Sequence, residues 1–428
     1  MIQNIKKSLF IRNVLTLMTG TAIAQALNII IAPILSRLYD PHAFGVFAVY
    51  TSIVSICVVV VGLKYELAIV LPKKQEDAAN VLYLSIIVVV FMTLLSTIFL
   101  FLFKDYLEIW FHIQGLNELI WWIPISILFF GIYNNFNYWS TRQKSFKRLS
   151  ISQIFRSISV AAIQLGGGIS KIGTVGLIAG QAIGHIVATV VLGKQIWKDD
   201  RQVLTSSFNF NKMKDLARTY KEFPKYSAPQ SLINSLSQNV APFILAAYFS
   251  PTVVGYYSLS LRLLQLPINL IGDSVRQVFY PRIAEIYNHG GDLHKYLVKS
   301  TVFLGVIILL PSLIIFLLGP LLFSIVLGKE WYEAGVYSQW MMLWLMFGFM
   351  NRPASATAQV LGLQKFLFYY EVLFFLSRLV VLILGAYYLS SLYTIIIYSI
   401  VGAIFNFSLI MTVIFYLKSR NEATENID

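Results

Sequence analysis

Charged residues are scarce in this chain. They make up 12% of its 428 residues, whereas hydrophobic residues make up 57%. Soluble domains carry roughly 25% charged and about 45–50% apolar residues, so the composition excludes an ordinary water-soluble protein. Cysteine is scarcer still, and the single Cys57 excludes a disulfide framework and a CxxC metal site. The chain has no GxxxxGK[ST] loop, so ATP is not the direct energy source and we expect no cofactor.

Long apolar runs take the place of charge, and many approach or exceed the ~20 residues that cross a bilayer. The sequence predicts an all-α integral membrane protein whose twelve transmembrane helices form two parallel-repeat six-helix bundles around a central cavity. The expected helices cover residues 13–35, 43–63, 78–103, 118–139, 150–168, 173–193, 227–249, 252–273, 299–322, 334–361, 366–388 and 392–417. The expected domains are an N-terminal bundle over 1–200, a cytoplasmic linker over 201–226 and a C-terminal bundle over 227–428.

An internal repeat supports this division into halves. The break between the first two apolar segments contains Pro41 and Gly45, and the same pattern returns 210 residues later at Pro251 and Gly255. An aromatic residue follows each glycine by two positions. Repeats in a hydrophobic chain are typical of transporters, whose sites lie between the repeats near the bilayer midplane.

The positive charge is distributed unevenly. The net charge is +13, and 26 of the 33 Lys and Arg residues fall in the segments that lie inside if the N-terminus is cytoplasmic. Only 4 fall in the outer connections, and 3 lie within helices. This bias follows the positive-inside rule, so both termini are expected in the cytoplasm. The basic excess then faces anionic lipid, and no nucleic acid is required as a partner.

Polar residues mark matching faces on the first and seventh expected helices. Thr21, Gln25 and Asn28 are spaced i, i+4, i+7, which places them on one helix face. Adding 210 gives a stripe that includes Ser235 and Gln238. We expect both faces to line the central cavity. Hydrogen bonding between packed helices is the alternative explanation.

The eighth expected helix carries a longer polar stripe. Its members are Ser258, Arg262, Gln265, Asn269 and Asp273, which share one face. Arg262 lies about ten residues from either helix end, so its guanidinium cannot easily reach the membrane interface. A charge at that depth costs several kcal/mol unless it is paired or hydrated. We therefore expect Arg262 to bind an anionic substrate, with an ion pair to Asp273 or another acid as the structural alternative.

Two further arginines lie within expected helices. Arg378 is also deep, and Glu371 precedes it by two turns on the same face. Arg156 occupies a roughly corresponding place in the first half but lies nearer the cytoplasmic end, where its side chain can extend to the interface. Arg378 and Arg156 therefore join the substrate-binding candidates, and no residue is expected to be catalytic or to bind metal.

Several segments resemble those of bacterial polysaccharide-export flippases. Leu35–Pro41 followed by Phe44–Phe47 resembles their first-loop signature. Tyr138–Lys144 resembles the connection between their fourth and fifth helices, and Ala358–Lys365 its repeat partner. These flippases belong to a superfamily that also holds multidrug-and-toxin extruders and peptidoglycan-precursor flippases. The latter typically have two extra helices, whereas this chain ends at twelve.

The resemblance implies a flippase of the bacterial cytoplasmic (inner) membrane. Its substrate would be an undecaprenyl-diphosphate-linked oligosaccharide, an O-antigen or capsular repeat unit, moved from the inner to the outer leaflet by alternating access. H+ or Na+ would be the coupling ion, and a polysaccharide polymerase would be a partner. Two alternatives stay open: a drug exporter of the same superfamily, and a membrane enzyme that polymerises or ligates lipid-linked sugars. An enzyme of that kind needs a sizeable external loop, and the longest outer connection here spans only about 104–117.

The charge asymmetry makes the topology testable. In a background that lacks Cys57, a cysteine at Gln114 should react with a membrane-impermeant thiol reagent added to intact cells, because 104–117 is expected outside. A cysteine at Asn211 should react only after the membrane is opened. The reverse labelling pattern would show that the orientation is inverted.

Overall fold

The computed structural model describes residues 2–111, 119–289 and 291–425, and all of its regular elements are helices within those ranges. It divides into two compact units, Met1–Pro251 and Thr252–Asp428. The first unit contains α1 (Ile2–Leu38), α2 (Pro41–Val61), α3 (Tyr65–Ala68), α4 (Gln75–Phe111), α6 (Trp122–Arg142), α7 (Phe146–Ile169), α8 (Thr174–Ser207), α9 (Phe210–Thr219), η1 (Phe223–Ser227) and α10 (Ala228–Tyr248). The second contains α11 (Pro251–Asn288), α12 (Leu293–Leu327), η2 (Lys329–Trp331), α13 (Tyr332–Met350), α14 (Arg352–Val360), α15 (Gln364–Tyr388) and α16 (Ser391–Glu425).

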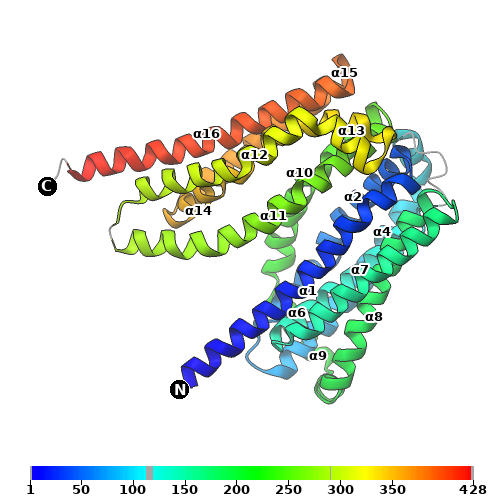
Figure 1. The fold of residues 1–428 in the computed structure, drawn as a ribbon. Helices are drawn as coiled ribbons and strands as arrows, with labels where there is room; N and C mark the ends of the chain where they lie inside the picture. The colour runs from blue at the N-terminus through cyan, green and yellow to red at the C-terminus, as the bar shows by residue number, and fades with distance from the viewer. Residues whose placement is uncertain (1, 112–118, 290, 426–428) are drawn as a thin grey trace. The chain divides into compact units, whose positions relative to one another are not determined.

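The two units repeat one order of packed helices (Figure 1). In the first unit, α4 packs against α6, α6 against α8, and α8 against α7. In the second, α12 packs against α13, α13 against α16, and α16 against α15. The first unit adds α1 against α7 and α10 against α2. The long helices α4, α12, α15 and α16 have mostly apolar surfaces. Neighbours bury them on some sides, and large apolar side chains stay exposed on others, as lipid contact requires.

Seven of the described helices are long and apolar enough to cross a membrane: the segments Thr19–Leu38, Pro41–Val61, Gln75–Phe111, Thr174–Ser207, Leu293–Leu327, Gln364–Tyr388 and Ser391–Arg420. The other five expected spans fall on α6, α7, α10, α11 and α13, which carry more polar or charged residues. The range expected as one helix over 334–361 is two helices, α13 and α14. Pro353 explains the break, because it has no amide hydrogen to continue the backbone ladder. The labelling position Gln114 lies outside the described residues.

The turn between α6 and α7 has a counterpart between α14 and α15. Lys144, with φ 55°, and Gly362, with φ 78°, each occupy the left-handed position after a helix. In both turns the next residue donates its amide to a carbonyl five residues back, from Ser145 to Ser140 and from Leu363 to Ala358. This is the Schellman arrangement, which satisfies carbonyls at the end of a helix.

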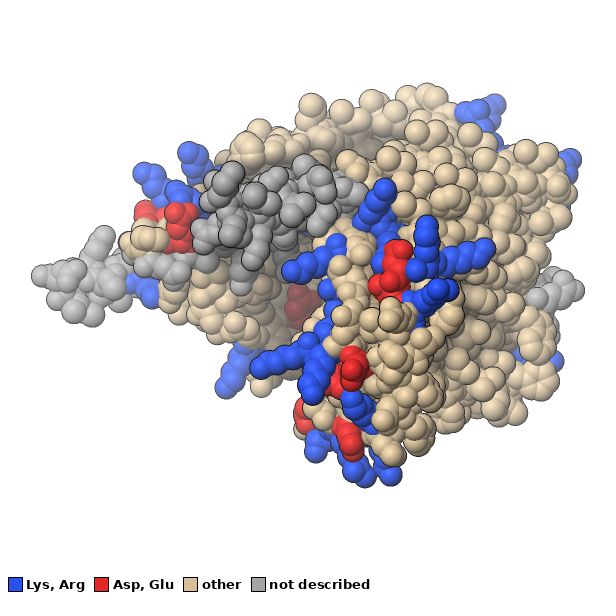
Figure 2. Space-filling model, turned by 90° about the horizontal axis from the view of Figure 1, so that it is seen from below, with Lys and Arg blue, Asp and Glu red and all other residues tan. Residues whose placement is uncertain are grey.

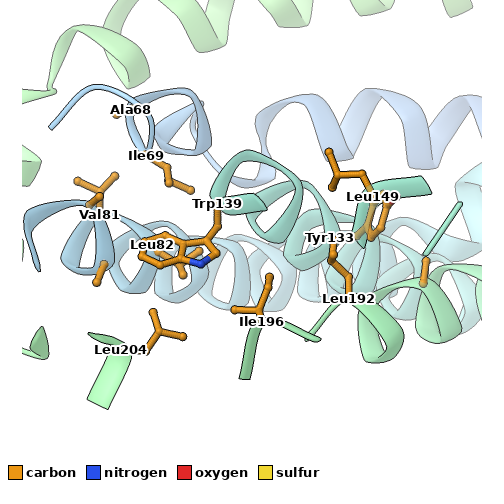
Figure 3. Packing of buried hydrophobic residues seen from close by; sticks show 13 residues of the cluster. Ala68, Ile69, Val81, Leu82, Tyr133, Trp139, Leu149, Leu192, Ile196 and Leu204 are labelled. Atoms are coloured by element: carbon orange, nitrogen blue, oxygen red, sulfur yellow. The ribbon is translucent and has the colours of Figure 1, made fainter. Parts of the chain in front are cut away.

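A hydrophobic core lies where α6 ends and α7 begins. Trp139 is fully buried there, among side chains from α3, α4, α6 and α8 that include Ile69, Leu82 and Ile196 (Figure 3). The Trp139 indole donates a hydrogen bond to Asp200 Oδ2 at 3.0 Å. Arg148 also binds Asp200, at 2.7 Å. The apolar ring is thus buried while its polar edge and the nearby charges are paired.

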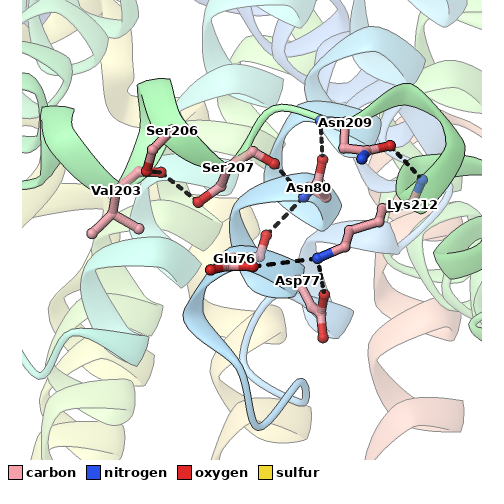
Figure 4. A network of polar contacts seen from close by, with 8 residues as sticks. All are labelled: Glu76, Asp77, Asn80, Val203, Ser206, Ser207, Asn209 and Lys212. Atoms are coloured by element: carbon pink, nitrogen blue, oxygen red, sulfur yellow. Dashed lines mark hydrogen bonds and ion pairs between the residues drawn. The ribbon is translucent and has the colours of Figure 1, made fainter.

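Asn80 fixes the end of α8 to the start of α4. Its side chain is fully buried and donates to the carbonyls of Glu76 and Ser207, at 2.9 and 2.7 Å (Figure 4). Its carbonyl accepts from the amide of Asn209 at 2.9 Å. Lys212 on α9 lies 3.3 Å from Glu76 Oε2. The segment expected as a linker is therefore helical in part, and it is attached to the first unit by specific hydrogen bonds.

Glu66 is a buried acid on the single-turn helix α3. Its side chain is 6% exposed, and its Oε1 lies 3.7 Å from Lys64 Nζ. Within the described part of the chain Oε2 has no hydrogen-bond partner. Leu63 and Lys64 both have positive φ values, 46° and 62°, which non-glycine residues rarely adopt. Burial raises the pKa of Glu66, and the Lys64 ammonium opposes that rise.

Replacing Asn80 by Leu should lower the thermal unfolding midpoint by several degrees. The Ser207 carbonyl and the Asn209 amide would each lose a buried partner, at a cost of about 1–3 kcal/mol per group. Asn211→Leu is the matched control, because Asn211 is exposed. Equal midpoints for the two variants in purified protein would show that the Asn80 bonds contribute no stability.

Glu66→Gln should raise the unfolding midpoint at neutral pH. Since the folded pKa of Glu66 is raised above its ordinary 4.5, the wild type loses stability as pH rises from about 4.5 through the folded pKa. The glutamine variant has no charge to bury, so its advantage should grow across that window and disappear at acid pH. Thermal unfolding over a pH series measures this, with the exposed Glu222→Gln as control. An advantage that does not change with pH would contradict the assignment.

Candidate functional site

A polar face of α11 forms the centre of the candidate site in the second unit. The helix begins at Pro251, whose missing amide costs nothing at a helix start. From there Ser258, Arg262, Gln265 and Asn269 follow on one face, because each lies three or four residues after the last. The structure therefore keeps the predicted stripe on one continuous helix. The side chain of its last member, Asp273, lies outside the described residues.

Arg262 is the exposed charge of this face. Its side chain is exposed although it lies eleven residues into α11, between the apolar residues Leu261 and Leu263. Among the residues whose side chains are described, no acid forms an ion pair with it. A guanidinium has five N–H donors arranged to meet two oxygens at once, which suits carboxylate or phosphate. Arg262 thus provides a cation that is available to an anionic ligand.

Arg352 on α14 joins the same face, and the sequence analysis missed it. Its Nη2 donates to Asn269 Oδ1 at 3.1 Å. Its guanidinium lies directly over Gly272, where a Cβ atom would come within 2.1 Å of Arg352 Cζ. Only glycine therefore permits this approach. In the sequence, the isolated Gly272 beside the polar stripe is a signal that a side chain from another helix packs closely there.

Arg378 is enclosed by aromatic rings rather than exposed. Its Cζ lies 4.2, 4.8 and 4.0 Å from the ring centroids of Trp344, Phe374 and Tyr398. Its Nε and Nη2 atoms and the Trp344 indole nitrogen are buried and have no hydrogen-bond partner in the described part of the chain. Cation–π attraction therefore stabilises this charge. Tyr257 on α11 meets Tyr398 edge-on at 6.4 Å, so the rings also contact the helix that carries the polar face.

Arg156 lies in the first unit, above the ring of Phe130 at 5.6 Å. His185 stacks on the same ring at 4.3 Å, and its Nδ1 is buried without a partner among the described residues. Matching the turns at Lys144 and Gly362 aligns Arg156 with Phe374 rather than with Arg378. The two arginines are therefore offset by one helical turn, and the rough correspondence expected from sequence does not hold in detail.

The structure does not bring the polar stripes of the first and seventh expected helices together through any described hydrogen bond. On α1, Gln25 and Asn28 are half-buried, and Thr21 bonds to Gln153 of α7 at 2.9 Å. On α10, Ser235 is buried, and Gln238 is exposed and donates to Asn234 of its own helix at 2.7 Å. The Thr21 bond is an instance of the alternative explanation, hydrogen bonding between packed helices.

The signature residues around the first loop are structural. The Asp40 side chain accepts the Ala43 amide at 2.7 Å and so caps α2. The Tyr39 hydroxyl donates to the Gln164 carbonyl at 2.6 Å. Gly176 makes room for that hydroxyl, because a Cβ there would lie 2.3 Å from it. These residues position α1, α2, α7 and α8.

Charge on the surface is grouped. In Figure 2, Lys and Arg side chains stand together on the visible face, while broad areas of that face carry neither sign. The exposed basic residues of the segment 201–226 include Lys214, Arg218, Lys221 and Lys225. Within the described residues, no group of three or more His, Cys, Asp or Glu side chains could hold a metal ion.

Sequence comparison connects these features to polysaccharide assembly. The family described as Polysaccharide biosynthesis protein matches residues 34–336. The Amylovoran biosynthesis protein AmsL of Erwinia amylovora is 25% identical over 202 residues. That alignment covers 46% of this chain and 50% of the relative, so the match spans about half the length of the curated protein.

Two solved structures share the fold. An inward-facing multidrug resistance MATE family transporter of the MOP superfamily has a TM-score of 0.71 at 15% identity, over 96% of this chain and 99% of that one. The lipid II flippase MurJ, in an inward closed conformation, has a TM-score of 0.74 at 16% identity, over 93% and 87%. These likenesses show the fold of the chain, and with the seven helices that are long and apolar enough to cross a membrane they indicate a multi-pass membrane protein. The expected resemblance is confirmed by the family match, and the chain belongs to the polysaccharide biosynthesis protein family.

Proposed function

We propose that this protein is a flippase for an undecaprenyl-diphosphate-linked oligosaccharide. It moves a repeat unit of O-antigen or capsular polysaccharide from the inner to the outer leaflet of the bacterial cytoplasmic membrane. Family membership supports the link to polysaccharide assembly. The likeness of the fold to a lipid II flippase supports movement of a lipid-linked substrate.

The proposal includes a topology. Twelve helices span the membrane with both termini in the cytoplasm, and the halves 1–200 and 227–428 alternate access around a central cavity. The positive-inside bias supports this orientation, and the repeated helix order of the two units supports the division into halves. The coupling ion is H+ or Na+, and a polysaccharide polymerase receives the product.

The observation that carries the proposal is the exposed Arg262 on the polar face of α11, with Arg352 hydrogen-bonded to Asn269 on that face. Moving a diphosphate through hydrocarbon requires fixed cations, because an unpaired charge in that medium is very costly. Arginine meets phosphate oxygens in a bidentate geometry that lysine cannot reproduce. Amide groups such as Gln265 and Asn269 suit the hydroxyls of a sugar. Arg378 is a weaker candidate for a second phosphate contact, because rings enclose it.

The same charges argue against the two alternatives. An exporter of cationic drugs needs an accessible acid deep in its membrane-spanning region, whereas the acids here lie near helix ends. Glu66 is buried beside Lys64 on a short connecting helix. Glu371 lies seven residues into α15, and Asp273 ends the polar stripe. The face of α11 instead presents arginine. An enzyme that polymerises sugars would act through catalytic groups on a sizeable outer loop. The transporter fold of the similar proteins supports transport rather than such chemistry.

Arg262→Ala should reduce export of the glycan at least tenfold while the amount of protein in the membrane stays near normal. The loss follows from a charge-assisted contact worth about 1.5–3 kcal/mol. Arg262→Lys should restore export only in part, because an ammonium keeps the charge and loses the planar fork. Transfer of labelled lipid-linked oligosaccharide across proteoliposome membranes measures the effect.

Arg282→Ala is the matched control for this experiment. Arg282 lies on the same helix and is exposed, but it pairs with Glu285 at 2.6 Å. Its removal should leave transport near wild type. If Arg262→Ala transports as fast as Arg282→Ala, the diphosphate does not bind at Arg262.

A further inference from the structure

An apolar cavity of about 290 Å³ lies within the second unit, between α11, α12 and α13. All of its lining residues are apolar. They include Ile268 and Ile271 from α11, Ile307 and Phe323 from α12, and Phe349 from α13. Taking the ~30 Å³ share of a water molecule as a measure, the cavity has room for roughly ten methylene-sized groups. No polar side chain lines it, so water finds few partners there and hydrocarbon is the matching occupant.

The cavity and the polar stripe lie on opposite faces of α11. At 100° per residue, positions 258, 262, 265 and 269 cluster around one direction, and positions 263, 264, 267, 268 and 271 cluster about 180° away. One helix therefore presents arginine and amides on one side and hydrocarbon on the other. That combination fits an amphipathic ligand, which has a polar part and an apolar part. A wholly polar ligand would not use the apolar side of the helix.

The shape of the cavity suits a linear chain. Its lining on α12 runs from Ile307 to Phe323, sixteen residues along the helix axis. Ile271 and Ile307 are 44% and 37% exposed and lie at its open edge, whereas Ile268 and Phe323 are each 6% exposed and lie deeper. Two lining residues are prolines within helices, Pro267 and Pro311, which interrupt the backbone ladder and bend a helix. The slot therefore follows α12 and is open at the edge formed by Ile271 and Ile307.

We propose that this cavity binds part of the hydrocarbon chain of the lipid whose phosphate is held on the polar face of α11. The inference rests on the proposed function and adds the place of the substrate's tail. The lipid straddles α11, with its phosphate at Arg262 and a few isoprene units in the slot, while the rest of the chain stays in the bilayer. A bulk phospholipid does not fit this description, because its phosphate stays at the membrane surface, whereas Arg262 lies eleven residues into α11.

Filling the slot tests the proposal. In Ile307→Trp the indole occupies the cavity mouth. Val306→Trp is the matched control, because Val306 is the preceding residue, is 67% exposed and does not line the cavity. Binding is measured as the rise in unfolding midpoint of the purified protein with added undecaprenyl phosphate, inorganic pyrophosphate or phosphatidylglycerol. Ile307→Trp should need at least tenfold more undecaprenyl phosphate for the same rise, and its response to pyrophosphate should not change.

Ile271→Trp blocks the slot from α11 and should show the same loss, so the test does not depend on one variant folding. Equal responses to undecaprenyl phosphate from Ile307→Trp, Ile271→Trp and Val306→Trp would overturn the proposal. Stabilisation of the wild type by phosphatidylglycerol as strong as that by undecaprenyl phosphate would also overturn it, because the slot would then hold bulk lipid. A wild type that responds to neither pyrophosphate nor undecaprenyl phosphate would refute the proposed function itself.

Discussion

The cost of leaving a polar group unpaired among apolar helices governs this structure. In hydrocarbon, every buried donor or acceptor needs a partner. Asn80 satisfies that need with three hydrogen bonds, and the Trp139 indole does so through Asp200. Arg262 and Arg378 sit deep in helices without such partners in the described part of the chain. The first is exposed, and the second is covered by rings. Most polar groups therefore explain the fold, and these two arginines are the exceptions to which we assign a function.

The residues that carry the family resemblance are mostly polar groups that stabilise the fold. Asp40 caps a helix, Tyr39 ties α1 to α7, and Arg142 donates to the carbonyls of Ile69 and Val70. Such contacts hold the bundle in shape whatever it transports. That explains why the signature is informative about the superfamily and poor at naming the substrate, which depends on faces such as that of α11.

Long apolar runs predicted where the long helices lie, and periodicity predicted the stripe on α11, because both depend on neighbours within one segment. The apolar runs also predicted one helix over 334–361, although Pro353 breaks that range. Comparison of the two halves paired Arg156 roughly with Arg378, and the two differ by one turn. Arg352 could not be predicted, because its bond to Asn269 joins residues 83 positions apart. The aromatic rings around Arg378 come from three helices, so their contacts with the guanidinium could not be predicted from the sequence either.

Arg262 and Arg378 both place a charge within the helices, and the two charges are stabilised in different ways. The difference suits the proposed transport function. A flippase must bind its substrate strongly enough to remove phosphate from water and weakly enough to release it on the other side. An exposed guanidinium exchanges water for phosphate oxygens at modest cost, so its binding is reversible. A guanidinium whose faces are covered by Trp344 and Tyr398 keeps its stabilisation without any ligand. In the proposed function, the exposed cation on α11 is therefore the one whose free energy depends most on whether substrate is present.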